Sequence, residues 1–329
     1  MKGLDIVPET VILLGLIIFF SINMGSSNFG ASFAAACGSG FLKKNAARLL
    51  YTLFIIIGAL AVGEPVAKTL GERIIPQELM TVNALIIIFL SASLSIFFSN
   101  WFSVPQSTSL VTVFALWGVG SYHGQVRIDT LFFLVPCWIF LPLTGFILTY
   151  FIGKIFYPPG RKNIWIYEKL AIHQGRLKIF VIAASCYNAF SIGTNNVANV
   201  AGPVAGVEHL SPLLTLLIAA PLFGAGSFLF SGTLELTSKK IVPLGPFTAT
   251  VVCFITGTLI IIASALGMPQ SFVMINMAAI FAISSLKKGK RKTFDDPSTR
   301  RTYYSWIIAP FFSFAVSFVA TALLDRFFL

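Results

Sequence analysis

The chain of 329 residues is 56% hydrophobic and only 11% charged, with a mean hydropathy of +0.86. Soluble domains carry about 25% charged residues, so the composition excludes a soluble protein. The apolar runs are continuous rather than alternating, which excludes a β-barrel and predicts an all-α polytopic membrane protein. The net charge of +11 does not indicate a nucleic-acid partner, because Lys and Arg fall in short loops between the predicted spans.

A predicted helix begins near Glu9 and runs into a polar stretch at 23–33. Further apolar segments follow in chain order at 49–62, 82–119, 131–151, 179–190, 213–229, 248–266 and 306–324. The longest polar connector separates two similar series of segments. We therefore divide the chain into a transmembrane first repeat (1–152), a cytoplasmic connector (153–178) and a transmembrane second repeat (179–329).

Polar breaks interrupt the third apolar segment of each half. One break carries Pro105-Gln106-Ser107-Thr108-Ser109, and the other carries Gly267-Met268-Pro269-Gln270-Ser271. Proline suits the first position of a helix, and hydroxyl side chains cap helix N-termini. Both segments are therefore predicted to form discontinuous or re-entrant helices.

A polar motif at 191–203 contains Thr194, Asn195, Asn196 and Asn199 between strongly apolar segments. Each polar group left unpaired in hydrocarbon costs several kcal/mol, so such a run must be buried in protein or line a wet cavity. A degenerate copy follows Gly25, and Asn28 lies 168 positions before Asn196. The two halves are therefore predicted to face each other across one polar site.

The basic residues predict how the halves are oriented. Loop 41–48 is basic, whereas its equivalent 207–211 has no Lys or Arg; loop 121–129 has one Arg, whereas 287–301 has seven Lys or Arg. Opposite bias in equivalent loops is typical of inverted-topology repeats, whose site lies near the membrane midplane. With the connector in the cytoplasm, both termini are expected outside the plasma membrane, the inner membrane of a bacterial cell.

Both motifs resemble the inorganic phosphate transporter family, whose repeats carry a Gly-Ala-Asn-Asp-Val-Ala-Asn signature. The similarity rests on 193–199 with Gly202 and Pro203, and it extends to Asn100-Trp101 and to the matching Trp138 and Trp306. The Asp of the signature is Asn28 in the first copy and Asn196 in the second. This departure resembles the sulfate permease branch of the family.

We expect the substrate to bind near four breaks that could present helix N-termini, because free N–H groups and the helix dipole bind anions. The four breaks are Ser26–Asn28, Pro105–Ser109, Thr194–Asn196 and Pro269–Ser271. The predicted substrate-binding residues are Ser26, Ser27, Asn28, Ser107, Thr108, Thr194, Asn195, Asn196 and Ser271. The alternative is that small residues such as Ser26 only permit close helix packing. The glycines are expected to serve transport itself, so that Gly193→Val stops uptake in a folded protein.

The two Asp-to-Asn changes favour sulfate over hydrogen phosphate. Sulfate has no proton to donate near neutral pH, so an amide donor suits it and a carboxylate repels it. The same changes remove anionic oxygens that Na⁺ prefers, which favours H⁺ as the coupling ion. Glu235 and Glu64 are the candidate proton carriers, with surface pairing to Lys239 or Lys68 as the alternative.

The sequence predicts a secondary active transporter that imports sulfate with H⁺ by alternating access. The alternatives are a sodium- or proton-coupled phosphate importer and an anion channel. An enzyme is not expected, because the sequence offers no nucleophile–base pair, metal-ligand cluster or cofactor motif, and we predict neither metal nor cofactor. Membrane lipid is an expected partner, and a homodimer is one assembly to consider.

Overall fold

The computed structural model describes residues 8–102, 104–207, 210–229, 242 and 244–328, and within them every regular element is helical. The first half contains α1 (Pro8–Gly38), α2 (Lys44–Val62), α3 (Glu64–Glu72), the 3₁₀ turn η1 (Gln77–Leu79), α4 (Val82–Trp101), α5 (Thr108–Tyr122) and α6 (Ile128–Phe156). Then come α7 (Ile164–Ile172), α8 (Gln174–Asn196), α9 (Ala198–Gly206), α10 (Pro212–Leu229), α12 (Pro246–Ala265), α13 (Phe272–Lys288), α14 (Lys290–Phe294) and α15 (Pro297–Phe328).

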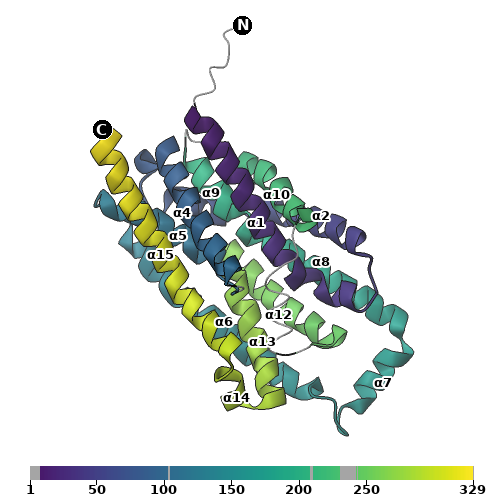
Figure 1. The fold of residues 1–329 in the computed structure, drawn as a ribbon. Helices are drawn as coiled ribbons and strands as arrows, with labels where there is room; N and C mark the ends of the chain where they lie inside the picture. Colours follow the sequence, from purple (N-terminus) through teal and green to yellow (C-terminus); the bar gives the residue numbers. More distant parts are fainter. Residues whose placement is uncertain (1–7, 103, 208–209, 230–241, 243, 329) are drawn as a thin grey trace.

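Eight helical segments of the described chain are long and apolar enough to cross a membrane, with α8 and α9 together forming one of them. The prediction of an all-α, multi-pass membrane protein is therefore confirmed. The start of α1 and the end of α15 lie at the same end of the bundle (Figure 1). Which side of the membrane that end faces stays a prediction.

Both predicted breaks in the third apolar segments are confirmed. Residues 102–107 separate α4 from α5, and residues 266–271 separate α12 from α13. The expected break at Ser26–Asn28 is wrong, because α1 is continuous from Pro8 to Gly38. Its polar side chains bond back to carbonyls of the preceding turn, Ser26 to Asn23, and Ser27 and Asn28 to Met24, at 2.9 Å each. Polar groups satisfied in this way do not interrupt a helix.

The expected N-terminus at Thr194–Asn196 is also wrong. These residues form the last turn of α8, and only Val197 separates them from α9. The Thr194 hydroxyl donates to the Ser191 carbonyl at 2.7 Å, so it too is satisfied within its own helix. The motif therefore presents side chains, rather than a helix N-terminus, to its surroundings.

Helices of the two halves pack across each other. Helix α1 packs on α10, and α2 packs on α8; the short α5 lies along α15, and α13 lies along α6 (Figure 1). Helix α7 stands apart from the bundle, inside the predicted connector. Helix α6 extends to Phe156, and α8 begins at Gln174, so both helices cross the predicted limits of that connector.

Glycines let the crossing helices touch. A Cβ on Gly25 of α1 would clash with the carbonyl oxygen of Phe223 on α10, and one on Gly193 of α8 would clash with that of Ile55 on α2. Gly226 meets the Ile22 carbonyl, and Gly58 meets that of Phe190, in the same manner. Gly25 and Gly193 are 168 positions apart, and so are Gly58 and Gly226. Backbones can approach this closely only where no side chain intervenes.

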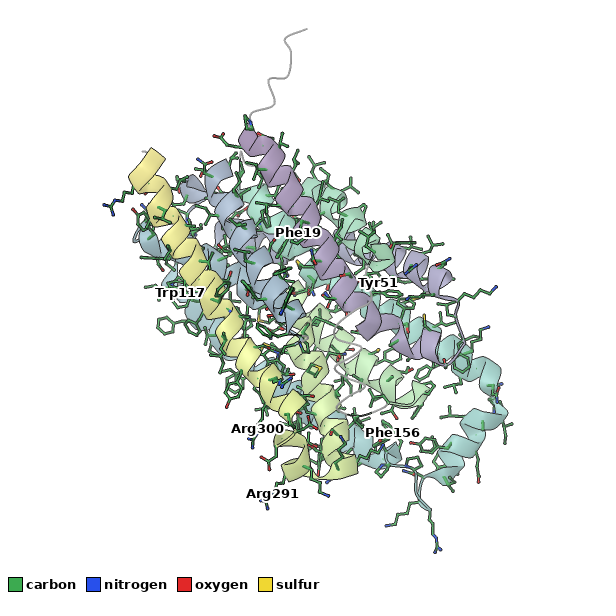
Figure 2. The ribbon with its side chains drawn as sticks, in the orientation of Figure 1. Phe19, Tyr51, Trp117, Phe156, Arg291 and Arg300 are labelled. Atoms are coloured by element: carbon green, nitrogen blue, oxygen red, sulfur yellow. The ribbon has the colours of Figure 1, made fainter. Side chains whose placement is uncertain are left out.

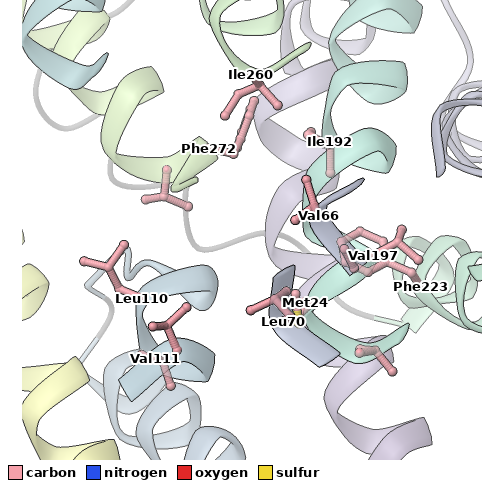
Figure 3. Packing of buried hydrophobic residues seen from close by; sticks show 14 of the residues in the cluster. Met24, Val66, Leu70, Leu110, Val111, Ile192, Val197, Phe223, Ile260 and Phe272 are labelled. Carbon is pink, nitrogen blue, oxygen red and sulfur yellow. The ribbon is translucent and has the colours of Figure 1, made fainter. Parts of the chain in front are cut away.

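Apolar side chains fill the space around the two breaks. Leu110 and Val111 of α5 are buried, and Phe272 at the start of α13 lies beside Ile260 of α12 (Figure 3). Charged side chains such as Arg291 and Arg300 lie at the end of the bundle where α15 begins (Figure 2). Apolar side chains thus surround both breaks.

Candidate functional site

The two broken segments resume with the same N-cap. Ser107 Oγ accepts from the Leu110 N–H at 3.2 Å, and Ser271 Oγ accepts from the Met274 N–H at 3.1 Å. Serine at this position satisfies one of the free N–H groups at a helix start. The remaining free N–H groups and the helix dipole give each start a positive potential.

These two helix starts meet inside the protein. The Ser109 hydroxyl in the first turn of α5 donates to the Gln270 carbonyl, just before α13, at 2.9 Å. Thr108, Ser109, Gln270 and Ser271 are all buried. Two positive helix ends that converge in a buried place favour an anion between or beside them.

Asn195 on α8 holds the break before α13. Its Nδ2 donates to the Met268 carbonyl at 3.0 Å and to Ser264 Oγ at 2.9 Å, and its Oδ1 accepts from the Gln270 N–H at 2.8 Å. Thr194 Oγ1 lies 2.9 Å from the same Ser264 hydroxyl. The amide therefore fixes two backbone groups of a segment without secondary structure of its own.

Asn199 on α9 contacts the other helix start. Its Nδ2 donates to Ser109 Oγ at 3.0 Å and lies 3.5 Å from Thr108 Oγ1. Asn195 and Asn199 are four residues apart and share one side of the helical run, so one motif reaches both breaks. Asn199, Ser109, Gln270 and Ser264 were not among the predicted site residues. Helical spacing from Asn195 and the paired glutamines, Gln106 and Gln270, are the sequence signals that point to them.

Each break is also tied to the long helix of the opposite half. Trp138 of α6 donates its indole N–H to the Pro269 carbonyl at 2.9 Å, and Ser305 of α15 donates to the Pro105 carbonyl at 3.1 Å. Trp306, the counterpart of Trp138, has a buried Nε1 without a partner among the described residues. The two breaks are therefore held at equivalent carbonyls by different side chains.

Asn28 and Asn196 are buried, and the Oδ1 of each has no hydrogen-bond partner among the described residues. Asn199 Oδ1 likewise has no hydrogen-bond partner among these residues. No hydrogen bond within the described chain links Ser26, Ser27, Asn28 or Asn196 to the helix starts. Their part in substrate binding, and the relation of Asn28 to Asn196 across a two-fold axis, stay predictions.

The buried hydrogen-bonding side chains of the described residues are all neutral, chiefly Ser, Thr, Asn and Gln, together with Tyr51 and Trp138. The same residues contain no group of three or more His, Cys, Asp or Glu placed to hold a metal ion. Glu64 is about half exposed and pairs with Lys68 at 2.7 Å, whereas Glu235 lies outside the described residues. The site between the helix starts is therefore lined by neutral groups.

Comparison with known proteins identifies the family. Residues 24–317 match the phosphate transporter family. The chain belongs to this family. The resemblance drawn from the two motifs is thereby confirmed, and the chain is a transporter rather than an enzyme.

Three proteins illustrate how far the similarity to this family extends. "Sulfate permease CysP" of Bacillus subtilis is 32% identical over 308 residues, 93% of this chain and 85% of the relative. "Putative phosphate permease MJ0630" of Methanocaldococcus jannaschii is 24% identical and covers 94% of this chain and 97% of its own. A solved structure titled "The sodium-dependent phosphate transporter" shares the fold, with a TM-score of 0.82 at 20% identity over 98% of this chain and 100% of its own.

Asn195→Leu is expected to destabilise the transporter and to stop uptake. The change leaves the Met268 carbonyl and the Gln270 N–H buried without partners, at a cost of about 1–3 kcal/mol each. Ser264→Ala is the matched control, since it removes one partner of Asn195 but leaves both backbone bonds. Thermal unfolding in detergent and uptake into proteoliposomes measure the two effects. Equal losses in both variants would mean that the backbone bonds of Asn195 contribute nothing.

Proposed function

We propose that this transporter imports inorganic sulfate by alternating access, driven by H⁺. The observation that carries the proposal is the neutral, donor-rich lining of the place where α5 and α13 begin. Hydroxyls, amides and free N–H groups can all donate to a proton-free dianion. No buried carboxylate among the described residues would repel such an anion. The 32% identity to a protein named as a sulfate permease supports the same substrate.

A phosphate importer is the second candidate. Other relatives are named as phosphate permeases, and the solved structure of the same fold is titled as sodium-dependent. The partnerless Oδ1 atoms of Asn28, Asn196 and Asn199 are oxygens that could ligate Na⁺. This observation favours sodium coupling, whereas the absence of a buried carboxylate among the described residues weakens it.

We further propose that the two halves are inverted-topology repeats that rock about the site. The matched glycine contacts support this arrangement, because Gly25 meets α10 as Gly193 meets α2. The hydrogen bonds from α6 and α15 to the break in the opposite half also support this arrangement. Movement of one half would then change the surroundings of both helix starts together. The expected position of both termini outside the cell belongs to this proposal.

Competition of labelled sulfate uptake by unlabelled anions tests the substrate. Excess phosphate is expected to leave uptake into proteoliposomes nearly unchanged, whereas unlabelled sulfate should suppress it, because the described part of the site offers no carboxylate to accept the phosphate proton. Strong inhibition by phosphate would overturn the sulfate proposal in favour of the phosphate importer.

The coupling ion is tested separately, with the same vesicles. An inward H⁺ gradient without Na⁺ is expected to concentrate sulfate, whereas an inward Na⁺ gradient at equal pH should not. Glu64→Gln and Glu235→Gln then ask which carboxyl group carries the proton. Sulfate that never exceeds its external concentration under either gradient would indicate a channel.

A further inference from the structure

A large apolar cavity lies outside the candidate site, between the end of α4 and the first half of α15. Its volume is about 770 Å³, within the range of ligand-binding pockets. Phe98, Phe102, Val104, Ile308 and Phe312 supply most of its walls. A small hydrated anion would gain little from such a lining, whereas a hydrocarbon chain would be well accommodated.

The polar groups of the cavity are mostly engaged already. Ser95 donates to the Ala309 carbonyl at 3.0 Å, Ser99 bonds to Gln106, and Ser305 donates to the Pro105 carbonyl at 3.1 Å. Arg301, at the end of the cavity nearest the start of α15, has no carboxylate partner among the described residues. A fixed positive charge thus stands at one end of an apolar space.

The surroundings of Arg301 add to this charge. Segment 287–301 contains seven Lys or Arg residues and only two acids, Asp295 and Asp296. Asp295 is bound by Arg300 at 2.6 Å and faces Arg291 at 3.8 Å. Asp295 therefore pairs with Arg300 and Arg291 rather than with Arg301, and the charge of Arg301 stays available.

We propose that this cavity binds one anionic phospholipid from the leaflet that contains segment 287–301. Its phosphate accepts hydrogen bonds from the Arg301 guanidinium, and one acyl chain occupies the space between α4 and α15. Basic pockets between membrane helices recognise lipid headgroups through this combination of charge and apolar wall. The bound chain lies against Val104, three residues before Ser107, the N-cap of α5.

Lipid titration followed by native mass spectrometry tests the proposal. Wild-type protein is expected to bind one dioleoyl phosphatidylglycerol more tightly than dioleoyl phosphatidylcholine. Arg301→Gln should weaken phosphatidylglycerol binding about tenfold, the loss of one hydrogen bond between charged groups. Lys292→Gln removes one charge from the same basic segment, at a residue that neither lines the cavity nor pairs with Asp295, and should leave binding unchanged.

The apolar half of the site is tested by filling it. Ile308 and Ile307 are 63% and 61% exposed, but only Ile308 lines the cavity. Ile308→Trp should therefore displace the lipid, whereas Ile307→Trp should not, and excess glycerol 3-phosphate should not compete. Equal binding of both lipids, equal effects within either variant pair, or competition by glycerol 3-phosphate would overturn the proposal.

Discussion

Asn196→Asp is expected to remove most sulfate uptake at pH 8 and to regain part of it as the pH falls. One carboxylate charge about 4 Å from a dianion costs about 2 kcal/mol even at the dielectric of water, or about thirtyfold in affinity. The position is buried, so the penalty inside the protein is larger. Burial raises the pKa of an unpaired carboxyl group, so protonation at lower pH should relieve the repulsion.

Asn188→Asp is the matched control for this change. Asn188 is also buried on α8, and its Oδ1 has no partner among the residues that the structure describes, but it lies about 12 Å earlier along the helix. Initial rates of sulfate uptake between pH 5 and pH 8 compare the two variants at equal amounts of inserted protein. Wild-type uptake by Asn196→Asp at pH 8 would remove Asn196 from the anion's surroundings.

Gly193→Ala is expected to destabilise the whole transporter, by about 1–3 kcal/mol or more, as added volume does in packed interiors. The new Cβ would clash with the Ile55 carbonyl oxygen, and backbone cannot move aside as a flexible side chain can. A larger residue such as Val should act more strongly. The expectation that Gly193→Val leaves the protein folded is therefore corrected by this contact.

Gly175→Ala is the control for that prediction, because a Cβ on Gly175 of the same helix would meet nothing within 4 Å. Thermal unfolding in detergent, read from intrinsic fluorescence, should show a lower midpoint for Gly193→Ala alone. Equal unfolding midpoints for the two variants would mean that the close contact between α2 and α8 does not contribute to stability.

Composition and local chemistry were enough to predict the helical bundle and both breaks before α5 and α13. Pro105 and Pro269 with the serines after them mark helix starts by a local rule, so no tertiary information was needed. The run Ser26–Asn28 has a similar composition, but its side chains bond back to Met24 and Asn23 and the helix continues. Sequence cannot distinguish these outcomes, because back-bonding and capping use the same residue types.

The candidate site was predicted in part. Thr108, Thr194 and Asn195 do lie where the two breaks come together, joined by Asn199 and Ser264, which were not predicted. The bond from Ser109 to Gln270 spans 161 positions, and local pattern carries no information about such a distance. Motif spacing located the polar segment, but only the hydrogen bonds of Asn195 on α8 and Asn199 on α9 show which amide reaches which helix start.

The neutral lining of the site has an electrical consequence. The buried groups of the described residues bear no charge, so their movement does no work against the membrane voltage when the carrier reorients empty, and the return step should be insensitive to voltage. All of the electrical work then falls on the loaded step, at about 2.3 kcal/mol per elementary charge for each 100 mV. A dianion entering a negative interior therefore needs two accompanying cations to cross without opposition, and a third before the voltage itself drives its accumulation.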